Sequence, residues 1–349
     1  MKYLFMALAT ILISLNSNAI TAQENIELNQ DKKITVRFDT RFDAQYTTFG
    51  RDKNTDIKPE DEGGFVGRYL KLLIDGKISD KFSYSFRHRL YTDHVNPKEF
   101  FSATDWANIT YTPNSKFSIT AGKQMICIGT IEYDYAPIDV YYASDFWNHV
   151  SPFQVGINVG FRPTNKHTIY AQIVNSPFSD KAFSNLYAFN AIWYGTITNW
   201  FKTIYSANML EYEKGNYINY LALGNKFSFN NTEIDLDYMN RYAGKSTAFF
   251  EDFTIMGKIS QKVGNKFKVF VKGGYDQNKT QLPGEEFIFD RYVLPGVERG
   301  FYGAGAEYFP LTTSKNTLRI HAYWYSTTEN PMPQTFNIGI RWQIKVLER

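Results

Sequence analysis

Apolar and polar side chains alternate along much of this chain. From residue 34 to residue 46 the odd positions are all polar, whereas the even positions are mostly apolar: Ile34, Val36, Phe38, Thr40, Phe42, Ala44 and Tyr46. Successive side chains of a β-strand point to opposite faces, so this stretch predicts a strand with one apolar face and one charged face. The pattern recurs near residues 82–90, 153–161, 234–239, 267–275, 318–324 and 336–344.

These runs predict about sixteen strands of roughly ten residues each, the length that a tilted membrane-spanning strand needs. We place their starts near residues 33, 65, 82, 103, 117, 153, 167, 187, 200, 217, 233, 250, 267, 298, 316 and 335. The segments that start near 103, 187 and 200 alternate poorly.

The predicted connections fall into two length classes. Short polar turns join some strands, as at residues 79–81, 113–116 and 264–266, and longer stretches such as 48–63, 126–151 and 277–296 lie between them. Aromatic residues also cluster at the ends of the strands. The fold class is therefore all-β, a transmembrane antiparallel β-barrel with short periplasmic turns and long external loops. A soluble β-sandwich also has apolar and polar faces, but it does not explain the sorted connections.

The N-terminal residues resemble an export signal. Lys2 precedes an apolar run over residues 3–15, and small residues follow it, with Ala19 and Ala22 as the two possible cleavage positions. This pattern predicts a secretory signal peptide over residues 1–22. Residues 23–349 then form a single barrel domain, which we expect in the outer membrane of a Gram-negative bacterium.

Composition excludes several other classes of protein. Aromatic residues make up 17% of the 349 residues, more than a cytosolic enzyme usually contains, and the formal net charge of +3 disfavours strong nucleic-acid binding. Cys127 is the only cysteine, so no intramolecular disulfide forms. None of the five histidines has a partner four residues away, and no Gly-X-Ser-X-Gly motif is present. We therefore predict neither catalytic residues nor a metal site or cofactor.

One stretch resembles a known family. The sequence Ala121-Gly-Lys-Gln-Met-Ile-Cys-Ile-Gly-Thr-Ile-Glu132 is similar to the Gly-Lys…Phe-Gly…Glu element of the phosphate-selective porin O and P family. The segments 133–139 and 144–148 continue the similarity, as does Gly67-Arg68 at the second strand. The resemblance implies a sixteen-stranded, trimeric porin that passes small anions through a lumen lined with Arg and Lys. It places Lys123 at the Gly-Lys position.

The polar positions of each strand predict the lining of the lumen. Basic residues outnumber acidic ones there by about two to one, and fixed positive charge in a narrow aqueous pore concentrates anions. The predicted basic lining is Arg37, Arg41, Lys71, Arg87, Arg89, Lys123, Lys258, Lys268, Lys272, Arg319 and Arg341. For Lys123 the parity disagrees with the resemblance, because Lys123 alternates in step with Ile119 and Ala121. It faces the lumen only if Gly122 marks a bulge that resets the register.

Residues 126–151 form an unusual connection. No Lys or Arg occurs from Gln124 to Phe161, whereas four acidic residues do: Glu132, Asp134, Asp139 and Asp145. Folded inward, this loop would narrow the pore and set its carboxylates across the lumen from the basic walls, producing a transverse field. Folded outward, the same carboxylates would bind divalent cations or another subunit.

The functional prediction is an outer-membrane porin, a passive diffusion channel for small hydrophilic solutes with a mild preference for anions, phosphate among them. Its expected partners are outer-membrane lipid, small anions and two further copies in a homotrimer. The alternative is a structural or receptor-type barrel with a closed lumen and ligand-binding or partner-binding loops. A transporter of hydrophobic solutes would need an apolar lumen, whereas the alternation predicts a charged one.

Overall fold

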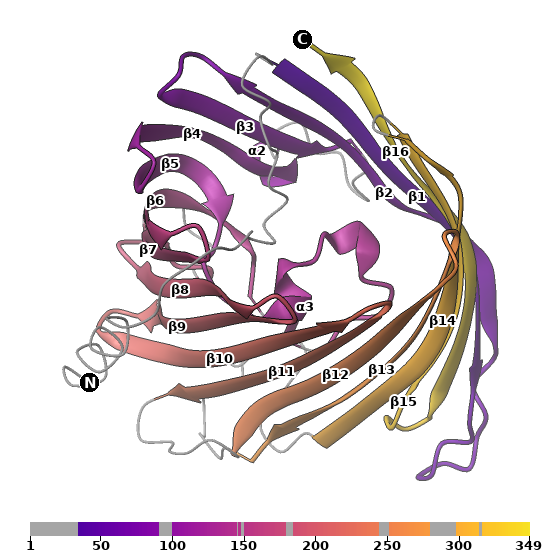
Figure 1. The fold of residues 1–349 in the computed structure, drawn as a ribbon. Helices are drawn as coiled ribbons and strands as arrows, with labels where there is room; N and C mark the ends of the chain where they lie inside the picture. The colour runs from indigo at the N-terminus through magenta and orange to yellow at the C-terminus, as the bar shows by residue number, and fades with distance from the viewer. Residues whose placement is uncertain are drawn as a thin grey trace.

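The computed structural model describes residues 34–90, 100–144, 146–147, 150–178, 184–243, 251–279, 298–313 and 316–349. Within them, sixteen antiparallel strands form one closed barrel (Figure 1). The predicted signal peptide lies outside the described residues.

The strands run as follows: β1 Ile34–Phe49, β2 Glu62–Lys77, β3 Phe82–Arg89, β4 Thr104–Asn114, β5 Phe117–Met125, β6 Phe153–Thr164, β7 His167–Asn175, β8 Tyr187–Thr198, β9 Phe201–Glu213, β10 Asn216–Phe229, β11 Thr232–Ala243, β12 Asp252–Val263, β13 Phe267–Asn278, β14 Glu298–Thr312, β15 Asn316–Thr327 and β16 Pro333–Glu348. Short helices occur at Phe100–Ala103 (α2), Ile131–Asp134 (α3) and Pro137–Asp139 (η3, a 3-10 helix). Every predicted start lies within three residues of the observed one, so the predicted transmembrane β-barrel is confirmed.

The barrel closes because β1 pairs with both β2 and β16. Each other strand pairs with its two neighbours in sequence. The β1–β16 register sets Phe38 opposite Ile344 and Phe42 opposite Ile340, so the apolar positions of both strands share one face. A closed barrel has no unpaired sheet edge, which excludes the soluble β-sandwich considered above.

The burial pattern is inverted relative to a soluble protein. The outward positions carry exposed apolar side chains, such as Ile157, Ile255 and Ile338, which are 50%, 49% and 57% exposed. The inward positions carry buried polar side chains, such as Arg41 and His321. This is the distribution expected of a barrel whose outer wall contacts lipid. Among the described residues, no helix has the length and apolar character needed to span a membrane.

The two ends of the barrel differ. At one end the strands are joined by short turns, as at 230–231 and 264–266, whereas the other end carries longer connections such as 50–61 and 126–152. The link from β9 to β10 is an exception, because only residues 214–215 form it. Stacked aromatic rings lie on neighbouring strands next to the short turns, in the pairs Phe82–Tyr111, Phe117–Phe161, Phe201–Phe227 and Phe267–Tyr308.

Gly122 allows β4 and β5 to approach closely. Its φ is +121°, a backbone conformation that L side chains rarely adopt. A Cβ at this position would clash with the carbonyl oxygen of Ala107 and lie 2.9 Å from the Cα of Asn108. The register passes through Gly122 without a shift on either side, so this residue is not a bulge.

We expect Gly122→Ala to lower the free energy of unfolding by about 1–3 kcal/mol, because it adds strain at positive φ and a backbone clash. The measurement is urea unfolding of the lipid-reconstituted barrel, followed by tryptophan fluorescence. Gly64→Ala is the matched control, since a Cβ at Gly64 would meet no atom within 4 Å. Equal losses from both substitutions would contradict this account.

Candidate functional site

The described residues of the stretch 126–151 lie inside the barrel, so of the two orientations left open by the sequence the inward one is observed (Figure 1). We call the described part of this stretch the inner segment. Its backbone is held by the wall. The amide of Gly129 donates to Ser206 Oγ at 3.0 Å. The Asp237 carboxylate accepts from the amides of Ile131 and Glu132, at 3.1 and 2.8 Å, and so satisfies the first N–H groups of α3.

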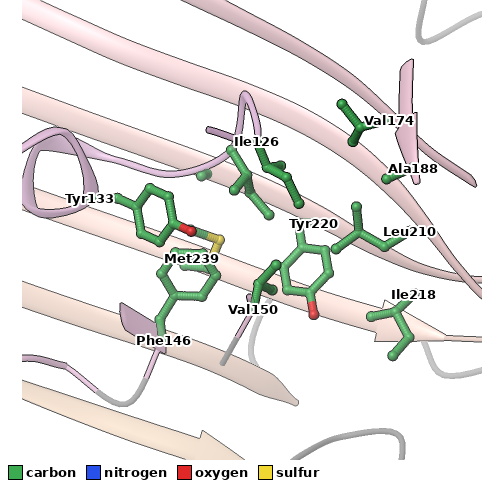
Figure 2. Close-up of a cluster of buried hydrophobic side chains, with 12 residues drawn as sticks. Ile126, Tyr133, Phe146, Val150, Val174, Ala188, Leu210, Ile218, Tyr220 and Met239 are labelled. Carbon is green, nitrogen blue, oxygen red and sulfur yellow. The ribbon is translucent and has the colours of Figure 1, made fainter. Parts of the chain in front are cut away.

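An apolar cluster joins the inner segment to strands β7–β11 (Figure 2). Five residues of the inner segment contribute, namely Ile126, Ile128, Tyr133, Phe146 and Val150. The wall contributes Val174, Ala188, Leu210, Ile218, Tyr220, Ala222 and Met239. Full burial of one such large side chain contributes about 1.5–3 kcal/mol, so the cluster holds the inner segment firmly against this half of the wall.

A second group of contacts joins the inner segment to strands β13–β15 and to β1. The Tyr141 hydroxyl donates to Glu307 Oε1 at 2.6 Å, and its ring lies 4.8 Å from the Arg41 guanidinium. The ring of Tyr142 stacks on Tyr325, with centroids 5.1 Å apart. Its hydroxyl donates to the Lys272 carbonyl at 3.1 Å. Together the two groups of contacts attach the inner segment to β1, to strands β7–β11 and to strands β13–β15.

The predicted constriction carboxylates do not stand across open water from the basic walls. Glu132 forms a buried ion pair with Lys272 and also accepts from Ser144. Asp139 pairs with Arg319 at 2.8 Å and with Arg341 at 3.4 Å. The predicted transverse field is therefore replaced by direct ion pairs at these two positions. Asp145 lies outside the described residues.

Asp134 is packed beside Tyr194 and Lys226. Burial raises the pKa of the Asp134 carboxyl to about 7, outweighing the stabilisation of its charge by these two neighbours. Burial likewise raises the pKa of the Cys127 thiol to about 12, so Cys127 is not a reactive thiolate.

Of the predicted basic lining, all residues except Lys123 lie on the inner face. Most of them have carboxylate partners: Arg37 with Asp75, Arg41 with Asp43, Lys71, Arg87 and Arg89 with Asp105, Lys268 and Arg319 with Glu307, Lys272 with Glu132, and Arg341 with Asp139. Lys258 forms no ion pair with a described residue. Its amino group lies over the rings of Tyr135 and Phe270, at 4.7 and 5.7 Å.

Lys123 was wrongly assigned to the pore lining. It pairs across the sheet with Ala107 and Val155, whose row also contains the exposed Ile157 and Ile109. Because the register does not shift at Gly122, Lys123 belongs to the outward face. Its amino group donates to the carbonyl of Phe101 at 2.8 Å, at the end of the barrel that carries the long connections. The parity of the sequence indicated this position, whereas the family resemblance suggested the opposite one.

Two spaces remain beside the inner segment. The large cavity, of about 390 Å³, lies between the inner segment and the wall from β1 to β8, with Arg37, Thr110 and Asn158 among its lining residues. The lysine cavity, of about 90 Å³, is lined by Lys166, Lys202 and Lys226 together with Asp134 and Tyr135. Within the described residues, no group of three or more His, Cys, Asp or Glu side chains is arranged to hold a metal ion.

Comparison with known proteins agrees with this architecture. Residues 36–200 match the family model described as phosphate-selective porin O and P. The resemblance read from the sequence is thereby confirmed for the part of the chain from β1 to the turn after β8. No curated protein matches the chain significantly.

Three solved outer-membrane proteins share the fold. An anion-selective porin from Comamonas acidovorans has a TM-score of 0.61 at 9% identity, covering 90% of this chain and 100% of that one. The outer-membrane channel DcaP of Acinetobacter baumannii has the same TM-score and identity, covering 90% and 97%. OmpT of Vibrio cholerae has a TM-score of 0.59 at 10% identity, covering 95% and 99%. At these identities the likeness shows the fold alone.

The buried pair Glu132–Lys272 provides a test of how the inner segment is held. Glu132→Gln leaves the Lys272 ammonium without its carboxylate, and we expect a loss of about 3–5 kcal/mol from the docking of the inner segment. The combined variant Glu132→Gln/Lys272→Met should lose less than the two single losses together. The readout is hydrogen exchange of the amides of Gly129, Ile131 and Glu132.

The control is Asp56→Asn, which breaks the exposed ion pair with Arg51 and should leave this exchange unchanged. Additive single losses would show that the two side chains are not coupled.

Asp134 should make this docking depend on pH. Its pKa is about 7 in the folded state against an ordinary value of 3.8 for an aspartate, so the folded state holds its proton more tightly. Docking is then most stable below about pH 4, weakens as the pH rises towards 7 and changes little above it. Protection factors from hydrogen exchange at pH 4.5, 6 and 8 should show this decline, and Asp134→Asn should reduce it. A decline of unchanged size in the variant would assign the effect to another group.

Proposed function

We propose that this protein is a passive outer-membrane channel for small hydrophilic solutes with a mild preference for anions. The main support for the anion preference is that three lysines of the lumen have no acidic partner among the described residues. Lys166, Lys202 and Lys258 form no ion pair with any described residue. The first two lie in the lysine cavity beside Lys226, which pairs with Glu233 and Asp235. Most other inward cations are matched by carboxylates, so these lysines are positions where the lumen presents positive charge to a solute.

Several further points support the proposal. The outer wall is apolar, the lumen wall is polar, and the large cavity leaves space beside the inner segment. A fold neighbour described as an anion-selective porin is consistent with the inferred ion preference. The family description makes inorganic phosphate the first anion to test. Export by a signal peptide over residues 1–22, location in the outer membrane and assembly as a homotrimer belong to the same proposal.

The second candidate is a closed structural or receptor-type barrel. It is favoured by the extent of the contacts between the inner segment and the wall, which occupy much of the lumen. Conductance separates the two candidates, because a closed barrel carries no current.

The decisive experiment measures the reversal potential of the purified protein in a planar bilayer under a tenfold KCl gradient. We expect an anion-selective potential and a chloride current that falls when phosphate is added. One unit charge about 8 Å from the ion path contributes about 0.5 kcal/mol in water. Lys202→Gln and Lys258→Gln should therefore each lower the chloride-to-potassium permeability ratio about twofold.

Lys116→Gln is the matched control, because Lys116 lies in the exposed turn between β4 and β5. It should leave the permeability ratio unchanged. A cation-selective potential would refute the proposed preference. The absence of any current from protein shown to be folded would favour the closed barrel.

A further inference from the structure

The large cavity has two chemically different walls. On the strand side, hydroxyl and amide groups line it, among them Ser85, Asn108 and Thr120. On the opposite side the lining includes Pro137 and Trp147 of the inner segment. Met125 and Phe153, the last pair of the β5–β6 ladder, add further apolar surface. The sequence predicts a charged lumen, whereas the lining of this cavity is polar on one side and largely apolar on the other.

Cations gather on the strand side. Arg87 lies with its guanidinium 3.6 Å from the ring centroid of Trp106 and 5.2 Å from that of Phe153. The carboxylate of Asp105 is shared by Arg87 at 2.7 Å, Arg89 at 3.1 Å and Lys71 at 3.4 Å. One carboxylate thus pairs with three cations.

Other carboxyl groups nearby reduce this excess, on the strands and, at Asp134, on the inner segment. Asp39 lies directly opposite Lys71 in the β1–β2 pair, so two carboxylates face the three cations that share Asp105. Asp75 is balanced by Arg37, at 3.4 Å. The strand side of the cavity therefore keeps one cation in excess, next to the aromatic rings of Trp106 and Phe153. The Asp134 carboxyl on the opposite side offsets it only in part, because burial keeps this group partly protonated at neutral pH.

The size of the cavity fits an organic solute. Its volume of about 390 Å³ falls within the roughly 300–1,000 Å³ range of small-molecule sites. An inorganic ion with its hydration shell gains nothing from an apolar wall. A solute with an apolar body, in contrast, removes that wall from water while its charged group remains beside the guanidinium groups.

We propose that the large cavity is a transit site for organic anions that carry an apolar body, such as aromatic carboxylates. This inference rests on the proposed channel function and names the solute class that the channel favours. The anionic group faces Arg87 and its neighbouring cations, and the apolar body contacts Phe153, Met125 and the inner segment.

The test compares phenylacetate, acetate and 2-phenylethanol as inhibitors of the chloride current through single channels in a planar bilayer at neutral pH. Phenylacetate should reach half-block at a concentration at least about tenfold lower than acetate, the ratio expected when about 60 Å² of apolar ring surface leaves water. The neutral 2-phenylethanol should block much more weakly than phenylacetate, since it has no charge for the cations to attract.

Two substitutions locate the effect. Met125→Gln and Phe153→Gln each replace apolar lining by a polar side chain, and each should lower the acetate-to-phenylacetate ratio of half-blocking concentrations by about threefold or more. Met332→Gln makes the same chemical change outside the cavity, at an exposed methionine between β15 and β16, and should leave the ratio unchanged. Either cavity variant suffices if the other does not fold.

The outcomes separate the two proposals. A channel that is anion-selective in KCl but shows no preference for phenylacetate over acetate overturns the inference and leaves the proposed function in place. Equal block by 2-phenylethanol and phenylacetate also overturns it, because the cations would then play no part. The absence of anion selectivity in KCl overturns the proposed function itself.

Discussion

The structure depends on one constraint, that every backbone N–H and C=O group within lipid must find a partner in the protein. The pairing of β1 with β16 satisfies it by removing the last sheet edge. Closure also fixes which way each side chain points, because pairing partners share a face. Apolar rows then meet lipid, and the charges of Arg41, Arg319 and Arg341 are confined to the inside.

Confinement of so many charges makes pairing necessary, and the inner segment supplies part of the pairing. Glu132 and Asp139 come from the inner segment, while Lys272, Arg319 and Arg341 come from the wall. The same segment also covers apolar wall positions that would otherwise face water. Ionic and apolar contacts both hold the inner segment against the wall, so we expect it to stay docked whenever the barrel is folded.

The positions of the strands could be predicted closely from the sequence because alternation is a local signal. Within each strand, the alternation alone indicates which residues face lipid, without knowledge of the other strands. The poor alternation near 187 and 200 had a cause that local reading could not identify. Inward residues of β8 and β9, such as Ile192, Ile204 and Leu210, are apolar because residues of the inner segment lie against them.

The candidate site was less predictable for the same reason. Charge counting identified the cations but not their partners, since Glu132 and Lys272 are 140 residues apart in sequence. It also left the apolar side of the large cavity unseen. At Lys123, local parity was the better guide, because an uninterrupted register carries more physical information than a short motif.

The stacked aromatic pairs beside the short turns have a consequence for how the barrel sits in a bilayer. Tyrosine and phenylalanine rings at the boundary between lipid and water favour one depth in the bilayer. Here such rings occur in pairs on neighbouring strands around much of the rim that carries the short turns. That rim acts as a fixed reference height in the membrane. Changes in bilayer thickness would then be taken up at the opposite rim, leaving the depth of the short turns constant.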